Sequence, residues 1–272
     1  MSPERRRWLR RLDAVLPMPL SHVVELDRVE DSAVRRRRRQ VVAGTAVGGA
    51  VLLGASLSTR PGSKAFYLST SAVAATWTAG GLGSGPLHLG WVENRDSTLR
   101  RPLLTPLATG VGAFGLFYAG ALVARRIPVL DDAVARILRF ADEGDAYLVM
   151  ATTLANGLAE EIFFRGALYS ALEEHYPAAA STGVYALATT TTRNPALVLA
   201  AGVMGSLFAL QRRASGGIQA PIITHLTWSS LMLRYLPPLF RDRTHGVETP
   251  SLGTDAARRR KYRETDRSGA RR

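Results

Sequence analysis

The chain has 272 residues, of which 46% are hydrophobic, and a formal net charge of +13. It contains no cysteine, which excludes a disulfide framework, a thiolate metal site and a cysteine nucleophile. Residues 1–40 hold eleven Arg against six acidic residues, and residues 241–272 hold ten basic against five acidic residues. Between these tails, long apolar runs alternate with short stretches of charge. This pattern is typical of a multi-pass membrane protein rather than of a soluble core.

The first apolar run covers residues 41–57 and directly follows five arginines, Arg35 to Arg39. Its length of about 17 residues is near the lower limit for crossing a hydrocarbon core of roughly 30 Å. Arginines beside a first membrane helix favour a cytoplasmic N-terminus, and anionic lipid head groups attract each of them by about 1 kcal/mol. We therefore expect a protein of the cell membrane whose residues 35–39 contact anionic lipid.

Six further apolar runs follow, at residues 65–83, 103–124, 146–164, 178–192, 195–210 and 218–236. Seven crossings would put the two basic tails on opposite sides of the membrane, against the tendency of positive charge to stay inside. Either one run is re-entrant or interfacial, or one tail lies outside. The predicted fold class is all-α, a polytopic membrane bundle of six to eight transmembrane helices over residues 41–240.

Two other segments are amphipathic. Residues 128–145 repeat apolar side chains at helical spacing with charges opposite them, which predicts a short helix on the membrane surface. A similar stripe runs from Trp8 to Leu16. The tail at 241–272 is poor in large apolar residues and is predicted to be disordered. Neither tail has interleaved stacking aromatics or a known binding module, so we expect no nucleic-acid partner.

Three ionisable side chains stand within six residues of one apolar run, in the sequence Glu160-Glu161-Ile-Phe-Phe-Arg165. A charge in a membrane helix costs roughly 2.5–3.5 kcal/mol. Glu161 and Arg165 are four residues apart and can form an ion pair on one helix face. Glu160 is turned about 100° away, over Asn156, where it has no intrahelical partner and suits general-base chemistry. The alternative is a helix that ends in head-group water, but the apolar pattern continues past the charges.

His225 is the second candidate, because it is one of five His in the chain and lies well inside an apolar run. Ser229 lies one turn further on the same face, so that an imidazole and a hydroxyl can converge. A lone His in a helix often has only a packing role. A carboxylate and an imidazole from two membrane helices are, however, common parts of a water-activating site. We therefore pair His225 with Glu160.

These residues resemble the CPBP family, the CAAX-processing and bacteriocin-processing intramembrane proteases. The resemblance covers residues 146–236. Residues 159–166 fit the first family motif, Glu-Glu-x-x-x-Arg, and residues 217–225 fit the third, which ends in His225. The family prefers Asn four residues after this His, where the chain has Ser229. The second motif, Phe-x-x-x-His, aligns best with residues 185–189, where Tyr185 replaces the Phe and Thr189 replaces the His.

The resemblance implies an intramembrane endopeptidase that depends on a metal or on glutamate. Glu160 would activate water, Glu161 with Arg165 would brace the helix, and His225, oriented by Ser229, would bind a metal or polarise the scissile carbonyl. Without the second His, the remaining metal ligands would be Glu160, Glu161 and His225, holding a divalent ion such as zinc. Thr189 could replace the missing His only as a neutral hydrogen-bond donor.

Two other functions stay open. The replacement of the family's His and Asn predicts, as an alternative, an inactive CPBP-like scaffold that binds membrane partners. A transporter is a third alternative, because buried Glu residues also serve proton relays, although the sequence has no paired inverted halves. The peptide or protein substrate is not identified by the sequence.

Overall fold

The structure is a computed structural model that describes residues 20, 31–93, 98–173 and 176–240. The predicted disorder of residues 241–272 and the amphipathic stripe from Trp8 to Leu16 lie outside the described residues. Within them the chain is almost entirely helical, as predicted for an all-α protein.

The apolar runs found in the sequence correspond to helices. They are α3 (Ser32–Ser56), α4 (Lys64–Gly83), α5 (Leu104–Ala124), α7 (Ala146–Glu160) with its continuation through η1 (Glu161–Leu168) and α8 (Tyr169–Ala171), α9 (Pro177–Thr189), α10 (Pro195–Ser215) and α11 (Gln219–Tyr235). The predicted amphipathic segment is α6 (Pro128–Asp142). Single-turn 3-10 helices, η2 (Thr190–Thr192) and η3 (Pro237–Leu239), follow α9 and α11, and a two-stranded hairpin, β1 (Val92–Glu93) and β2 (Leu99–Arg100), precedes α5.

Local signals in the sequence fix where several helices begin. The side chains of Ser63, Asp145 and Asn194 accept hydrogen bonds from backbone N–H groups of the first turns of α4, α7 and α10. Such N-caps satisfy donors that a helix leaves unpaired. Proline occupies the first position of α6, α9 and α10, where its missing N–H costs nothing. Local sequence signals therefore determine where several of the helices begin.

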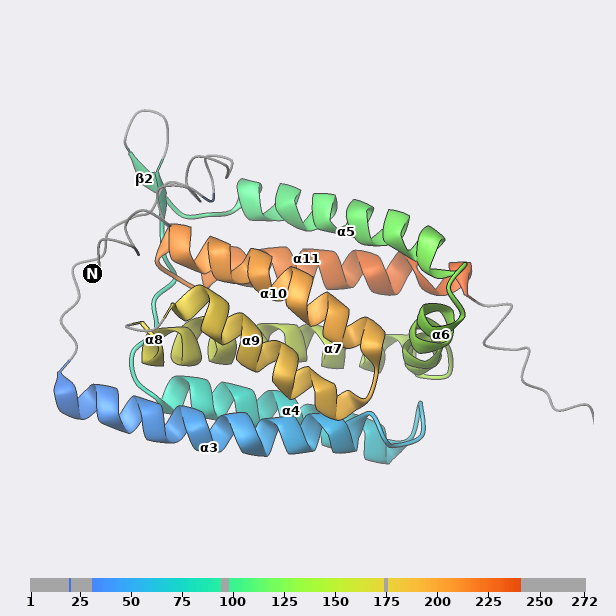
Figure 1. Cartoon of the computed structure of the whole chain (residues 1–272), viewed down its shortest axis with the longest axis horizontal. Helices are drawn as coiled ribbons and strands as arrows, with labels where there is room; N and C mark the ends of the chain where they lie inside the picture. The colour runs from blue at the N-terminus through green and yellow to red at the C-terminus, as the bar shows by residue number, and fades with distance from the viewer. Residues whose placement is uncertain (1–19, 21–30, 94–97, 174–175, 241–272) are drawn as a thin grey trace, which may run out of the picture.

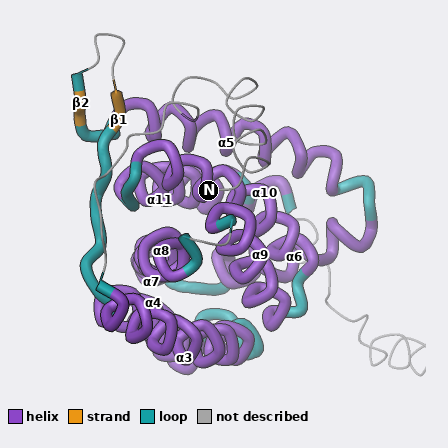
Figure 2. The backbone as a smooth tube through the Cα atoms, turned by 60° about the vertical axis from the view of Figure 1, so that its left-hand side comes forward, coloured by secondary structure: helices purple, strands orange, loops and turns teal. Residues whose placement is uncertain are grey.

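The long helices lie side by side and run between the same two ends of the molecule, with α6 across one end (Figure 1). Figure 2 shows α3 and α4 together on one side of α7, and α5 and α11 on the opposite side. Helices α9 and α10 pack against each other and complete the bundle. The segment of α7 and η1 contacts α4, α9, α10 and α11, so it occupies the centre of the arrangement.

Aromatic packing holds the central segment against α3 and α4. Trp77 is fully buried, and its ring centroid lies 4.7 Å from that of Phe163 and 5.0 Å from that of Phe164. The lack of a side chain at Gly49 leaves space for the Trp77 ring, because a Cβ at this position would lie 2.3 Å from it. Close packing of this kind leaves no room for relaxation. It fixes the part of the chain that carries the two glutamates.

Two of the described helices, α5 and α10, are long and apolar enough to cross a membrane. Large apolar side chains also stand exposed on the outside of the bundle, including Leu68, Leu104, Leu116 and Leu187. Exposed apolar side chains of this size suit a lipid environment. At about 1.5 Å per residue, the 13 residues of α9 extend only about 20 Å. The six to eight crossings therefore remain a prediction.

Candidate functional site

The two glutamates stand where the α-helix changes its geometry. Glu160 is the last residue of α7, and Glu161 is the first residue of η1, a π-helix of eight residues. A π-helix bonds each residue to the fifth one along the chain, which widens the turn, and such segments are rare and often found at functional sites. Here the widened turn carries Glu161 and Arg165, while Glu160 projects from the end of the ordinary helix.

Glu161 is completely buried and has two partners on one of its oxygens. Arg165 Nη1 donates to Glu161 Oε1 at 3.2 Å, as the spacing of four residues predicts. His225 Nδ1 lies 2.9 Å from the same oxygen, although it belongs to α11. Glu161 Oε2 has no hydrogen-bond partner among the described residues. The carboxylate therefore connects the central segment to α11 and does not reach solvent.

Arg165 is as buried as Glu161 and is held from several sides. Its Nη2 donates to the carbonyl oxygen of Gly205 in α10 at 3.1 Å. Its guanidinium carbon lies 4.7 Å from the ring centroid of Tyr185 and 5.1 Å from that of Phe208. Cation–π contact and hydrogen bonding together compensate the cost of burying this charge. The predicted brace thus extends beyond its own helix to α9 and α10.

Glu160 points to a different neighbour from Glu161. The hydroxyl of Tyr185, in α9, donates to Glu160 Oε2 at 2.7 Å. Asn156, over which the sequence places Glu160, instead donates to the backbone oxygens of Thr70 and Thr152. Glu160 is only half-buried, whereas Glu161 is inaccessible. Of the two carboxylates, Glu160 is therefore the one that a substrate or a water molecule can approach.

His225 is oriented by Glu161 and by an aromatic ring. Its imidazole stacks on Phe208 of α10, with ring centroids 4.7 Å apart and an angle of 20° between the planes. A carboxylate facing Nδ1 favours a proton on that nitrogen, which leaves Nε2 for other partners. Gly157 of α7 lies beside the Nε2 edge, since a Cβ there would be 3.5 Å from Nε2. A small residue at this position leaves room around Nε2.

Glu160 and His225 line one cavity of about 280 Å³ between the helices. Tyr185, Thr189 and Ser229 line it as well, whereas Glu161 and Arg165 do not. Side chains of α6 close part of its wall. The structure therefore brings all seven residues singled out in the sequence into one neighbourhood, five of them around the cavity and two directly behind it.

Two of these residues have contacts that differ from those predicted. Ser229 is buried beside the cavity, but the Nδ1 of His225 is bonded to Glu161 and no hydrogen bond joins the described Ser229 and His225 side chains. Thr189 donates its hydroxyl proton to the backbone oxygen of Tyr185, one turn earlier, at 2.8 Å. A short hydroxyl readily bonds within its own helix. Sequence spacing alone does not reveal this preference.

The sequence predicts a metal site at Glu160, Glu161 and His225. Within the described ranges, no group of three or more His, Asp or Glu side chains is arranged to hold a metal ion. His225 supplies one nitrogen, Glu161 already engages Arg165 and His225, and Thr189 offers only a hydroxyl. A catalytic zinc ion usually has three protein ligands. The donor set as placed does not fit this requirement.

The hydroxyl of Tyr185 is the functional group that sequence reasoning missed. In the sequence, Tyr185 stands out only as an aromatic residue in a motif position normally occupied by Phe. The signal was present, because Tyr differs from Phe only by a group that can donate a hydrogen bond. What the sequence lacks is the information that α9 places this hydroxyl against Glu160.

The fold and the site define a helical membrane protein with a carboxylate–imidazole cluster in its interior. The family model described as type II CAAX prenyl endopeptidase Rce1-like matches residues 142–231, which include α7, η1, α9, α10 and most of α11. The resemblance to the CPBP family is therefore confirmed over residues 142–231, which are similar to a family of membrane proteases. No curated protein and no solved structure matches the chain.

Proposed function

We propose that the chain is an intramembrane endopeptidase in which Glu160 activates the water that attacks a peptide bond. The observation that carries the proposal is that Glu160 lines the same cavity as His225, inside a segment that matches the Rce1-like family. A cavity between membrane helices excludes bulk water and strengthens electrostatic interactions within it. A peptide segment could therefore be hydrolysed there without exposure to the solvent.

The chemistry assigns a role to each side chain. Glu160 takes a proton from water, the water oxygen attacks the carbonyl carbon, and the proton passes to the leaving amine as the C–N bond breaks. His225 in its protonated form donates from Nε2 to the developing oxyanion. Tyr185 holds the Glu160 carboxylate in position. Glu161 and Arg165 stay out of the reaction and orient His225.

This role of His225 requires a proton on both ring nitrogens, with Nδ1 facing the Glu161 carboxylate. Because the donor set does not fit a metal ion, the proposed reaction uses none.

The proposal is tested by mapping cleavage in membranes of cells that produce the full chain. New protein N-termini are compared for the wild type, Glu160→Gln and the control Glu143→Gln, whose carboxylate is exposed and pairs with Arg139 on the surface. We expect N-termini that appear with the wild type and the control and vanish with Glu160→Gln. A farnesylated CAAX peptide is added as a separate probe, since the family model names prenyl endopeptidases. Equal cleavage by all three proteins would overturn the proposal.

An inactive scaffold is the second candidate, and a specific contact favours it. The Thr189 hydroxyl is bonded to its own helix, so the position of the family's second His offers no ligand to the cavity. A scaffold would produce no Glu160-dependent N-termini but would retain membrane partners after purification. If those partners are lost on substitution of cavity residues while no cleavage is found, the scaffold function replaces the protease.

We further propose that the chain crosses the cell membrane several times with its N-terminus in the cytoplasm. The support is the arrangement of the long helices between two common ends, together with Arg35 to Arg39 at the start of α3. The opposite end includes the acidic residues of α6. Positive charge is retained on the cytoplasmic side.

A further inference from the structure

The five arginines at the start of α3 differ in burial and in hydrogen bonding. Arg38 is almost completely buried, and its Nη1 and Nη2 donate to Ser84 Oγ and to the Pro86 carbonyl oxygen. It therefore fixes α3 to the end of α4. Arg35, Arg36, Arg37 and Arg39 remain exposed, and all of them except Arg37 line one surface hollow. The attraction to lipid expected for residues 35–39 therefore comes from the exposed arginines at the start of α3 and not from Arg38.

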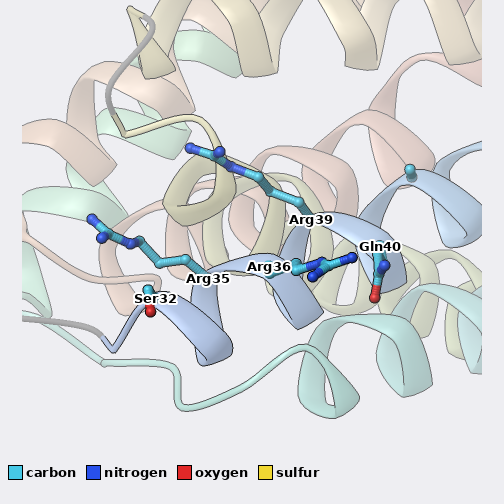
Figure 3. A pocket seen from close by; sticks show the side chains of 6 residues that line it. Ser32, Arg35, Arg36, Arg39 and Gln40 are labelled. Carbon is cyan, nitrogen blue, oxygen red and sulfur yellow. The ribbon is translucent and has the colours of Figure 1, made fainter.

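The surface hollow lined by three of these arginines has a volume of about 600 Å³. Figure 3 shows their side chains around it together with Ser32 and Gln40. Ala43 completes the lining, and none of the six residues is acidic. A guanidinium group presents donors in a planar fork that matches the oxygens of a phosphate. The hollow is therefore complementary in charge and in hydrogen bonding to a phosphate group.

The surface that continues from the hollow is apolar. Gln40, Ala43, Val47 and Val51 follow Arg36 at spacings of three or four residues, which places them on one face of α3. The side chains of Val47 and Val51 are 68% and 64% exposed. A polar hollow at the start of the helix thus continues into an uncovered apolar stripe. An anionic phospholipid has this same order of groups, from its phosphate to its acyl chains.

We propose that this face of α3 binds one anionic phospholipid. The phosphate lies in the hollow among Arg35, Arg36 and Arg39, and an acyl chain lies along Ala43, Val47 and Val51. The site is separate from the cavity of Glu160, so its occupancy does not depend on peptide hydrolysis. Arginine provides both the charge and the geometry, and the valines provide contact for the chain.

Native mass spectrometry of the full-length protein in detergent tests the site. The probes are phosphatidylglycerol, phosphatidylcholine and glycerophosphoglycerol, which is the head group without acyl chains. A basic residue near an anionic lipid changes affinity by about fivefold, so Arg35→Gln/Arg36→Gln/Arg39→Gln is expected to weaken phosphatidylglycerol binding by about a hundredfold. The matched control, Arg60→Gln/Arg125→Gln/Arg126→Gln, removes three arginines elsewhere and is expected to bind as the wild type does.

Two further variants separate binding from folding. Arg36→Gln alone changes an exposed side chain and is expected to lose about fivefold in affinity. Arg35→Lys/Arg36→Lys/Arg39→Lys keeps the charge but loses the planar forks, so it is expected to bind more weakly than the wild type and more tightly than the triple Gln variant. The proposal is overturned if the control triple loses as much affinity as the hollow triple. It is also overturned if glycerophosphoglycerol binds as well as the lipid, or if α3 of a second copy covers the stripe in a dimer.

Discussion

Glu161 Oε1 lies 2.9 Å from His225 Nδ1, and both side chains are buried although 64 residues separate them in sequence. The same oxygen accepts from Arg165, so one atom joins the central segment to α11. This arrangement makes Glu161 the residue that orients the imidazole. Its neighbour Glu160 keeps its carboxylate at the cavity.

Breaking the buried ion pair should destabilise the fold strongly. Removing one partner of a buried pair leaves an uncompensated charge and typically costs 3–5 kcal/mol, so we expect about that loss for Arg165→Met. The control, Arg139→Met, breaks an Arg–Glu pair of the same spacing whose side chains are 50% and 44% exposed. Exposed pairs contribute about 0.2–1 kcal/mol. Denaturant unfolding in detergent measures both, and equal losses would contradict the burial argument.

Tyr185→Phe should lower the turnover number with little change in KM. A hydrogen bond to a charged group contributes about 1.5–3 kcal/mol, which corresponds to about tenfold to a hundredfold in rate if it acts in the transition state. The substrate is whichever cleavage site the mapping of N-termini identifies. Tyr147→Phe serves as the control, since Tyr147 is 90% exposed. A change in KM alone would mean that Tyr185 contacts the substrate rather than positioning Glu160.

Chelation should leave cleavage intact. The described donors do not form a three-ligand group, so treatment with EDTA or 1,10-phenanthroline is expected to preserve activity. Thr189→His restores the family's second imidazole on a wall of the cavity and should raise the zinc content of the purified protein, measured by elemental mass spectrometry. Complete loss of wild-type activity on chelation, with recovery on adding zinc, would return a metal to the mechanism.

Replacing each of two neighbouring glycines of α3 by alanine should change the stability of the protein in opposite directions. Gly49→Ala places a Cβ 2.3 Å from Trp77 and should destabilise the protein by about 1–3 kcal/mol through overpacking. Gly48→Ala meets nothing within 4 Å and should stabilise it by up to about 1 kcal/mol, because alanine favours the helix. Melting temperatures in the same detergent give the comparison. Similar shifts for both variants would contradict the packing of α3 on α4.

The absence of cysteine allows the membrane orientation to be measured directly. Single-cysteine variants Ala33→Cys and Ser58→Cys place a thiol just inside and just beyond the two ends of α3. We expect an impermeant maleimide to label Ser58→Cys in intact cells, and to label Ala33→Cys only after the membrane is permeabilised. Labelling of both variants in intact cells would contradict a crossing by α3.

Local sequence determined the order and the type of the elements. Ser63, Asp145 and Asn194 are N-caps whose role is readable from their position before an apolar run. The ion pair between Glu161 and Arg165 also followed from spacing, because both belong to one helical segment. The motif around Glu160 and the one ending in His225 were sufficient to indicate the family, and the match over residues 142–231 confirmed it.

The tertiary structure determined which side chains contact one another across different helices. Nothing in the sequence distinguishes Ser229 from Glu161 as the residue that orients His225, or places the Tyr185 hydroxyl on Glu160. Those contacts depend on how α7, α9 and α11 are rotated against one another, and that rotation is set by packing such as Gly157 of α7 against His225 of α11. Interactions within a helix depend on spacing, which the sequence contains. Interactions between helices depend on relative orientation, which only the packed bundle defines.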